Sequence, residues 1–162
     1  MKKEFIELIN RHNRILHKIC NIYFYKNPYR EDYYQEILIR LWKSYPGFKK
    51  QCAFSTWLYR VALNTTIDII RKQTIQPAYI ALSKNEYNIP DTNQNIESDR
   101  KDKLYQAINQ LSPIEKAIII LYLEEYEYKE IAEIMGITES NTGVKITRIK
   151  SQLIKIFENE QN

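Results

Sequence analysis

The 162-residue sequence contains only three glycines, two cysteines and two histidines. Glycine this sparse argues against a phosphate-binding glycine-rich loop and against a turn-rich all-β fold. No stretch approaches the roughly 20 apolar residues that a transmembrane helix needs. The first 16 residues carry a charge every few positions and have no apolar core of a signal peptide. We therefore expect the protein to stay in the cytoplasm.

The residues that could carry chemistry are scattered along the chain. Cys20 and Cys52 belong to no CxxC pair, so we expect two ordinary reduced thiols. His12 and His17 are five residues apart, a poor spacing for sharing one helical face. We find no acidic cluster with metal-ligand spacing and no nucleophile elbow. The sequence thus predicts no metal, no cofactor and no enzymatic activity.

Charge is divided unevenly between the two halves of the chain. Residues 1–74 contain 14 Lys and Arg against 6 Asp and Glu, a net charge of +8. Residues 75–162 contain 10 against 14, a net charge of −4. A basic N-terminal half suggests a polyanionic partner, although an ordinary solvated helical surface also fits the charge alone.

Apolar residues recur at helical spacing on both sides of one irregular segment. The pattern predicts three helices in the first half, over residues 3–25, 31–45 and 55–73, the last with Ser55 as its N-cap. Residues 75–97 lose this periodicity and collect Pro, Asn, Ser, Thr and Asp, as a linker does. We therefore predict an all-α fold with two small helical domains, 1–74 and 98–162, joined by a flexible linker over 75–97.

The C-terminal half has the sequence pattern of a helix-turn-helix. Ser112 and Glu115 form a capping-box pattern that starts a helix ending near Glu124. Two further helices are predicted over 128–135 and 139–157. Between them, Gly136 suits a left-handed turn, Ile137 fills the corner and Thr138 caps the last helix.

The last helix has two distinct faces when it is projected at about 100° per residue. Its inner stripe comprises Thr142, Ile146, Ile149, Leu153 and Ile156. Its outer face comprises Asn141, Lys145, Arg148, Gln152 and Lys155. Such an outer face can contact base edges and phosphates in the major groove, and a solvated amphipathic helix is the alternative.

A basic helix with aromatic neighbours is predicted in the N-terminal half. Thr56, Arg60, Asn64 and Arg71 fall within one arc of about 80° over residues 55–73. Aromatic residues beside a basic loop are typical of proteins that bind unstacked single-stranded bases. Core packing is the other interpretation of the aromatic residues, and we favour it for Trp42, Phe54 and Trp57.

Two stretches of the sequence resemble a known family. Residues 30–42 (REDYYQEILIRLW), Phe48, residues 54–64 (FSTWLYRVALN) and 68–71 (DIIR) resemble region two of extracytoplasmic-function sigma factors of bacterial RNA polymerase. Residues 111–116 (LSPIEK) and 128–139 (YKEIAEIMGITE) resemble region four of the same family. The family's usual EGTVKSR after the turn is absent here, where residues 139–145 read ESNTGVK. The promoter preference of other members is therefore not transferable.

The resemblance implies core RNA polymerase and promoter DNA as partners, together with an anti-sigma factor. It places polymerase-binding residues at Asp32, Gln35, Glu36, Ile39, Leu41 and Trp42. It places contacts with the opened minus-ten strand at Phe48, Lys49, Lys50, Phe54, Ser55, Thr56, Arg60, Asn64 and Arg71. It places contacts with the minus-thirty-five duplex at Ser140, Asn141, Val144, Lys145 and Arg148. It also implies that the linker threads the polymerase cleft.

Other functions explain less of the chain. A stand-alone helix-turn-helix regulator accounts for residues 111–157 but leaves the first 74 residues without a role. A purely structural helical adaptor accounts for neither motif. The sequence does not specify the recognised promoter, and it leaves open whether Gly143, inside the last helix, serves a close approach of DNA or is merely tolerated.

Overall fold

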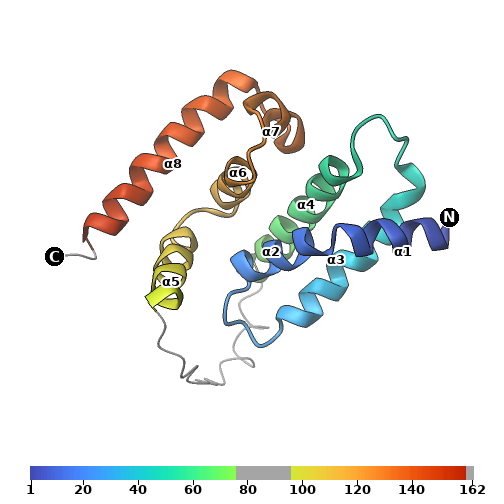
Figure 1. Cartoon of the computed structure of the whole chain (residues 1–162), viewed down its shortest axis with the longest axis horizontal. Coiled ribbons are helices and arrows are strands. Elements are labelled where there is room, and N and C mark those ends of the chain that lie inside the picture. The colour runs from blue at the N-terminus through green and yellow to red at the C-terminus, as the bar shows by residue number, and fades with distance from the viewer. Residues whose placement is uncertain (76–95, 160–162) are drawn as a thin grey trace.

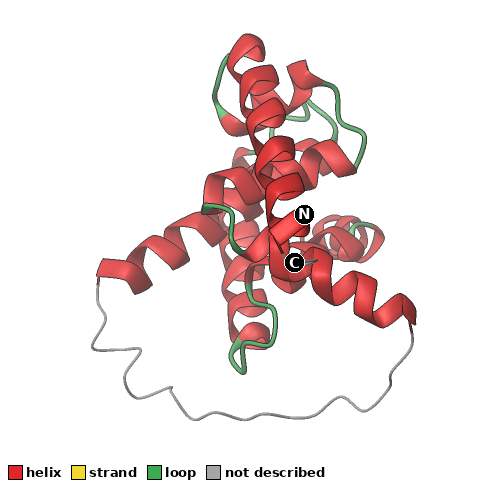
Figure 2. Ribbon diagram, turned by 90° about the vertical axis from the view of Figure 1, so that its left-hand side faces the viewer, coloured by secondary structure: helices red, strands yellow, loops and turns green. Residues whose placement is uncertain are grey.

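A computed structural model of the chain describes residues 1–75 and 96–159, without the side chains of 96–101. These residues form helices and connecting turns and contain no strand (Figure 2). They divide into two helical domains, which confirms the predicted all-α fold. Apart from its two ends, the predicted linker lies outside the described residues.

The first domain contains four helices and one short 3₁₀ turn. They are α1 (Lys2–Arg11), α2 (Asn13–Tyr23), α3 (Arg30–Ser44), η1 (Tyr45–Gly47) and α4 (Phe54–Ile75). The second domain contains α5 (Ile96–Asn109), α6 (Pro113–Leu123), α7 (Tyr128–Met135) and α8 (Glu139–Asn159). Figure 1 shows α5 to α8 on one side of the molecule and α1 to α4 on the other.

The prediction of one helix over residues 3–25 was wrong. The chain leaves helical geometry at His12, where φ is −109° and ψ is 13°, and this residue separates α1 from α2. At this break the Leu8 carbonyl oxygen lies 2.9 Å from the His12 Nδ1 and also accepts from the His12 backbone N–H at 3.2 Å.

Two smaller boundary predictions also need correction. Ser55 is not an N-cap, because α4 already begins at Phe54 and Ser55 lies in its first turn. The predicted linker was too long at both ends, since α4 continues to Ile75 and α5 begins at Ile96.

The two domains have hydrophobic cores of different chemistry. In the first, aromatic rings gather beside the aliphatic residues, and Tyr45 lies 5.0 Å from Phe5 and 6.1 Å from Trp57 between ring centroids. In the second, the buried residues are mainly isoleucines. They are Ile108, Ile118, Ile119, Ile120, Ile131, Ile134, Ile146 and Ile149.

The two domains also pack against each other. Helix α2 contacts α5 and α6, and helix α4 contacts α6 and α7. The flexible linker predicted from the sequence implies two modules that move independently, and this stays a prediction. Within the described residues, no helix is both long and apolar enough to cross a membrane.

Candidate nucleic-acid and protein interfaces

The predicted helix-turn-helix is present in α7 and α8. Helix α7 starts with a capping box in which the Glu130 carboxylate accepts from the Glu127 backbone N–H at 2.9 Å. It ends at Gly136, whose φ of +68° and ψ of 35° are left-handed. The Thr138 hydroxyl oxygen then accepts from the Asn141 backbone N–H at 3.2 Å, which caps α8. The sequence-based assignment of this turn is therefore confirmed.

Helix α8 separates an inner from an outer face, as its projection predicted. Thr142, Ile146 and Ile149 are buried against α6 and α7. The exposed residues of the DNA-contact set are Ser140, Asn141, Val144 and Arg148, while Lys145 is half-buried. An exposed polar strip directly after the turn has the form of a recognition helix that enters a major groove.

Gly143 lies beside the start of α7 and has ordinary helical backbone geometry. A Cβ atom added at Gly143 would meet the Tyr128 ring at 3.5 and 3.6 Å, which is normal van der Waals contact. Neither backbone conformation nor packing in the free protein therefore requires glycine at this position.

Helix α3 presents most of the residues assigned to polymerase binding. Asp32, Gln35 and Glu36 are exposed, and the apolar side chains of Ile39 and Trp42 remain 53% and 39% exposed. A shallow hollow of about 200 Å³ lies between Glu36, Ile39, Arg40 and Lys43. Exposed isoleucine and tryptophan on one helix are typical of a protein-binding surface.

Leu41 is the exception among these residues, and its assignment to polymerase binding needs correction. Its side chain is 0% exposed and packs in the core of the first domain. The helical repeat explains the difference, because Leu41 follows Ile37 by four residues and shares its buried face. Ile39 lies between them in sequence and faces outward.

The aromatic loop after α3 is only partly accessible. Phe48 is half-buried, with its ring centroid 5.6 Å from that of Phe54 and 5.1 Å from that of Trp57. Phe54 and Trp57 are buried, which agrees with the core interpretation of both rings. The same interpretation of Trp42 was wrong, because its side chain is 39% exposed. The assignment of Phe54 and Thr56 to DNA contact is therefore corrected, because both are buried in α4.

Charged residues flank this loop. Lys49 and Lys50 are exposed, and the Lys50 ammonium lies 2.8 Å from the Glu4 carboxylate. The hydrogen bond from Lys50 holds the pKa of Glu4 below its ordinary value. The loop thus remains basic, with one lysine already paired to α1.

Helix α4 carries the predicted basic face. Arg60, Asn64 and Arg71 are exposed, and Ser55 is half-buried. Arg60 does not project freely into solvent, because its guanidinium donates to the Glu133 carbonyl oxygen of α7 at 3.0 Å. This contact between the domains was not foreseen from the sequence.

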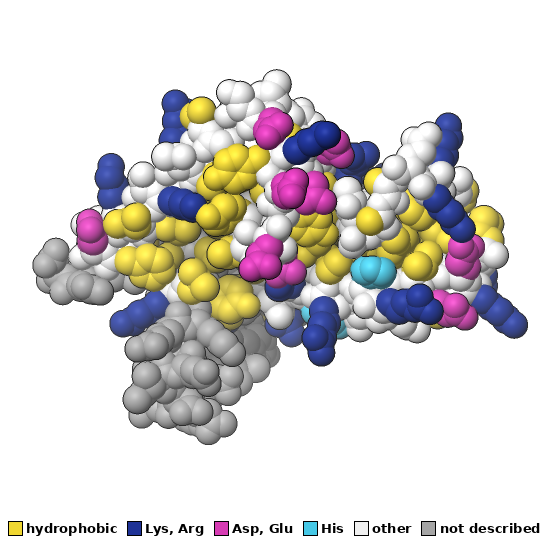
Figure 3. Space-filling model, turned by 45° about the horizontal axis from the view of Figure 1, so that its top comes forward, with side chains coloured by type: hydrophobic (Ala, Val, Ile, Leu, Met, Phe, Trp, Pro, Cys, Tyr) yellow, Lys and Arg dark blue, Asp and Glu magenta, His cyan; other side chains and the backbone are white. Residues whose placement is uncertain are grey.

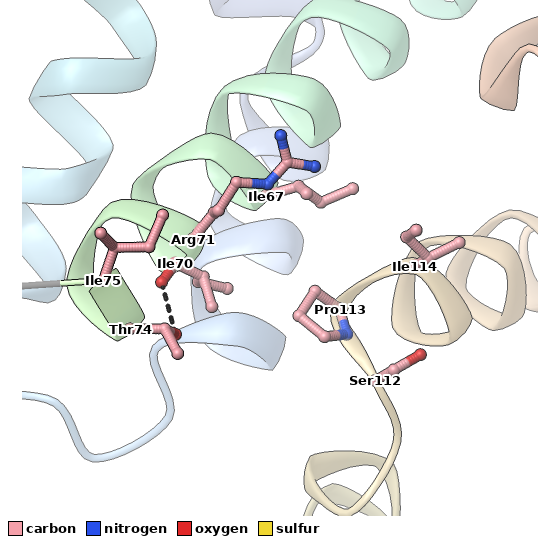
Figure 4. A pocket seen from close by; sticks show the side chains of 8 residues that line it. All are labelled: Ile67, Ile70, Arg71, Thr74, Ile75, Ser112, Pro113 and Ile114. Atoms are coloured by element: carbon pink, nitrogen blue, oxygen red, sulfur yellow. Dashed lines mark hydrogen bonds between the residues drawn. The ribbon is translucent and has the colours of Figure 1, made fainter.

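An apolar groove also escaped the sequence analysis. It has a volume of about 300 Å³ and lies between α4 and the start of α6. Figure 4 shows Ile67, Ile70 and Arg71 of α4 facing Pro113 and Ile114 of α6. The groove could not be found by periodicity, because its two walls come from segments about 45 residues apart.

Further apolar side chains are exposed on the second domain. Figure 3 shows hydrophobic side chains in yellow across the half of the molecule that carries α8. The large exposed hydrophobic side chains of α5 to α8 are Leu104, Ile114, Leu123, Tyr128, Val144 and Ile154. Over the described ranges, no group of three His, Cys, Asp or Glu side chains is placed to hold a metal ion.

Known proteins resemble the chain over both domains. Residues 8–75 match the family model described as Sigma-70 region 2, and residues 101–153 match Sigma-70, region 4. The RNA polymerase sigma factor SigS of Staphylococcus aureus is 30% identical, over 85% of this chain and 88% of the relative. The ECF RNA polymerase sigma-E factor of Haemophilus influenzae is 27% identical, over 94% of this chain and 86% of the relative.

A solved structure has the same fold over nearly the whole length. It is the sigma factor RpoE in complex with the anti-sigma factor NepR from Bartonella quintana, with a TM-score of 0.74 and 18% identity, covering 96% of this chain and 98% of that one. Two matched regions in the expected order, together with these relatives, identify the family. The chain belongs to the extracytoplasmic-function group of RNA polymerase sigma factors.

Proposed function

We propose that the protein binds core RNA polymerase and directs it to a specific set of promoters. Sigma factors are transcription initiation factors rather than enzymes, and this chain would act with polymerase in the cytoplasm. The observation that carries the proposal is that one chain has two exposed surfaces of different kinds, one on each domain. An exposed apolar strip lies on α3 of one domain, and a recognition helix, α8, lies on the other.

Helix α3 is the proposed polymerase-binding surface. Ile39 and Trp42 leave apolar area in water that the packing of α1 to α4 does not use. The neighbouring Asp32, Gln35 and Glu36 are exposed and can form a polar rim around that area.

Helix α8 is the proposed reader of the minus-thirty-five duplex. Asn141 and Arg148 lie on its exposed face, where asparagine suits adenine and arginine suits guanine or phosphate. Lys145 is half-buried beside them, and its ammonium suits a phosphate contact.

Helix α4 and the loop before it are proposed to act on the melted minus-ten strand. Arg60, Asn64 and Arg71 form a basic and polar face, and Lys49 is exposed at the loop. Phe48 retains partial exposure and is the aromatic side chain of the loop best placed to stack on an unpaired base.

An anti-sigma factor is a further proposed partner. A protein of the same fold was crystallised with the anti-sigma factor NepR, which supports this partner.

The decisive experiment adds the purified full-length chain to core polymerase and maps transcript starts on genomic DNA. We expect starts at discrete sites that share one upstream sequence. If the chain binds those duplexes equally well without polymerase and produces no starts, a stand-alone helix-turn-helix regulator becomes the better assignment.

Single substitutions assign the surfaces. Ile39→Arg should weaken binding to core polymerase, whereas Ile6→Arg, on an exposed isoleucine of α1, is the matched control and should not.

Arg148→Ala should relax the upstream sequence preference by about 1–3 kcal/mol. Asn64→Ala should spare upstream binding and impair strand opening, as permanganate footprinting on closed and premelted templates would show. Normal opening by Asn64→Ala would remove Asn64 from the melting role.

A further inference from the structure

The loop between η1 and α4 has few hydrogen bonds of its own. It comprises residues 48–53, and Phe48 is held at one end by ring contacts with Phe54 and Trp57. From residue 49 to residue 52, no backbone N–H donates to the carbonyl oxygen of another described residue. The tip of the loop, residues 49–52, therefore takes its position from side-chain contacts.

One ion pair joins this tip to α1. Apart from the half-buried Cys52, which packs against the core, the tip is held by the Lys50 ammonium, which donates to the Glu4 carboxylate at 2.8 Å. Lys50 has a φ of +55°, a left-handed conformation that is unfavourable for a residue with a Cβ atom. The pair thus fixes the side chain of the one loop residue whose backbone is strained.

The carboxylate of Glu4 is itself held in place. Phe5, the next residue of α1, is buried with its ring centroid 5.0 Å from that of Tyr45 and 5.1 Å from that of Trp42. Figure 1 shows the start of α1 close to η1. The hydrogen bond from Lys50 is the main cause of the lowered pKa of Glu4, and one from the Tyr45 hydroxyl adds to it. Helix α1 therefore presents an ionised, anchored carboxylate to the loop.

This pair is not needed to hold the domain together. Lys50 and Glu4 have side chains that are 69% and 48% exposed, and ion pairs in water contribute little to the free energy of folding. Helix α1 is anchored by the buried Phe5 and Ile9 instead. The effect of the pair is therefore local, on the conformation of the loop.

We propose that Glu4 is a positioning residue for the 48–53 loop, which it holds ready for an unpaired base through its ion pair with Lys50. That the loop receives such a base rests on the proposed function. Lys50 then supports the loop and does not contact DNA, whereas the exposed Lys49 remains available to phosphates of the strand. A loop that is fixed before binding loses less conformational entropy when it captures the base.

The two possible roles of Lys50 predict opposite signs for one substitution. Glu4→Gln removes the ion pair and one negative charge. If Glu4 positions the loop, affinity for the single strand falls by up to about fivefold, the range of an exposed ion pair. If Glu4 only keeps Lys50 away from DNA, the same change strengthens binding. Glu7→Gln, at an exposed glutamate one turn further along α1, is the matched control and should not weaken binding.

Exchanging the two charges separates support from contact. Glu4→Lys combined with Lys50→Glu rebuilds the pair with its charges reversed, so affinity should return to within about twofold of the wild-type value. A lysine that bound a phosphate would give the opposite result, since a carboxylate in its place repels the strand. Lys50→Gln should also leave the salt dependence of binding unchanged, whereas loss of a phosphate contact reduces its slope by about 0.7.

Binding is measured with the full-length chain assembled with core polymerase, on the isolated non-template strand of a mapped promoter. 2-Aminopurine replaces single adenines of this strand, and its fluorescence changes when a base leaves the stack, so it reports base capture. Thermal unfolding is recorded for every variant, and we expect unchanged midpoints because both side chains are exposed.

Weaker strand binding by Glu4→Gln, restored by the charge exchange, would support the positioning role. Unchanged or stronger binding by Glu4→Gln, a charge exchange that fails to restore affinity, or a smaller salt slope for Lys50→Gln would overturn it. If the wild-type complex starts no transcripts, the proposed function fails and the positioning role fails with it. Failure of the positioning role alone leaves the transcript starts of the wild-type complex intact.

Discussion

The two domains reach helical folds by different means. In α5 to α8, local caps fix helix ends: the Ser112–Glu115 and Glu127–Glu130 capping boxes start α6 and α7, and the left-handed backbone of Gly136 ends α7. In the first domain, no side chain caps the starts of α1, α2 or α3. Its helix ends therefore depend more on packing between helices than on local hydrogen bonds.

This difference fits the proposed tasks of the domains. A recognition helix must hold its residues at fixed positions against base edges, and local caps fix where it begins. The first domain has to offer an apolar surface to a large partner and a basic face to a flexible strand. Its aromatic cluster of Phe5, Tyr45 and Trp57 fills the hydrophobic core, and these ring contacts do not determine where each helix begins or ends.

The largest effect should follow loss of a core side chain in the first domain. Leu41→Ala removes buried methyl groups and should destabilise α1 to α4 by about 2–5 kcal/mol. Ile39→Ala is the matched control on the exposed face and should change stability by no more than about 0.5 kcal/mol. Urea unfolding followed by NMR signals from each domain measures both. Equal loss of stability in α5 to α8 would show that the two domains unfold as one unit.

The contrast between the domains also explains what the sequence could predict. The turn at Gly136, the capping box at Ser112 and the bounds of α7 were predicted correctly, because each depends on residues within a few positions. The break at His12 was missed, because apolar residues keep near-helical spacing across it and leave no signal in the periodicity.

The candidate site, like the fold, was predictable where it depends on local sequence and not where it depends on contacts between distant residues. The open face of α8 follows from helical periodicity. The exposure of Trp42 does not, because the sequence favoured core packing for its ring and the side chain is 39% exposed. The burial of Leu41 follows from its spacing of four residues from Ile37, and that of Phe54 agrees with the core interpretation made from the sequence. The burial of Thr56 could not be predicted without the packing of several helices. The pairing of Arg60 with Glu133 joins residues 73 positions apart, and no local pattern could have shown it.

The second-largest loss of stability should follow a change in the turn between α7 and α8. Gly136→Ala places a Cβ on a residue with φ of +68° and should cost about 1–2 kcal/mol. Steric overlap plays no part, since nothing lies within 4 Å of the added atom. Gly47→Ala, also in open space but without positive φ, is the control and should be close to neutral. Thermal unfolding compares the two, and similar costs would mean that backbone handedness does not determine the turn.

Alanine substitutions of two serines compare a helix that has a side-chain cap with one whose serine lies inside the first turn. Ser112→Ala removes the hydroxyl that accepts from the Glu115 backbone N–H and should cost about 1 kcal/mol. Ser55 has the same sequence appearance but lies inside the first turn of α4. Ser55→Ala should therefore stay within about 0.5 kcal/mol in the same unfolding measurement. A cost equal to that of Ser112→Ala would restore Ser55 as a cap.

The smallest effect should have the opposite sign and concerns Gly143 of α8. Alanine is favoured over glycine inside a helix by about 1 kcal/mol, and the added methyl would only touch the Tyr128 ring at ordinary distance. Gly143→Ala should therefore stabilise the second domain by up to about 1 kcal/mol. The methyl points at Tyr128 of α7 rather than along the face of Asn141 and Arg148. We accordingly expect duplex binding at a mapped promoter to be unchanged.

Gly143→Ala thus decides between the two explanations of this glycine. Urea unfolding gives the stability, and competition binding of the polymerase complex to the mapped duplex gives the affinity. Higher stability with equal affinity would show that the glycine is merely tolerated. Higher stability with weaker binding would mean that the DNA backbone passes close to Gly143, and would contradict our expectation. In that case the first turns of α8 would have two roles. Gly143 would let the DNA backbone pass close to the helix, and the exposed face would contact the bases.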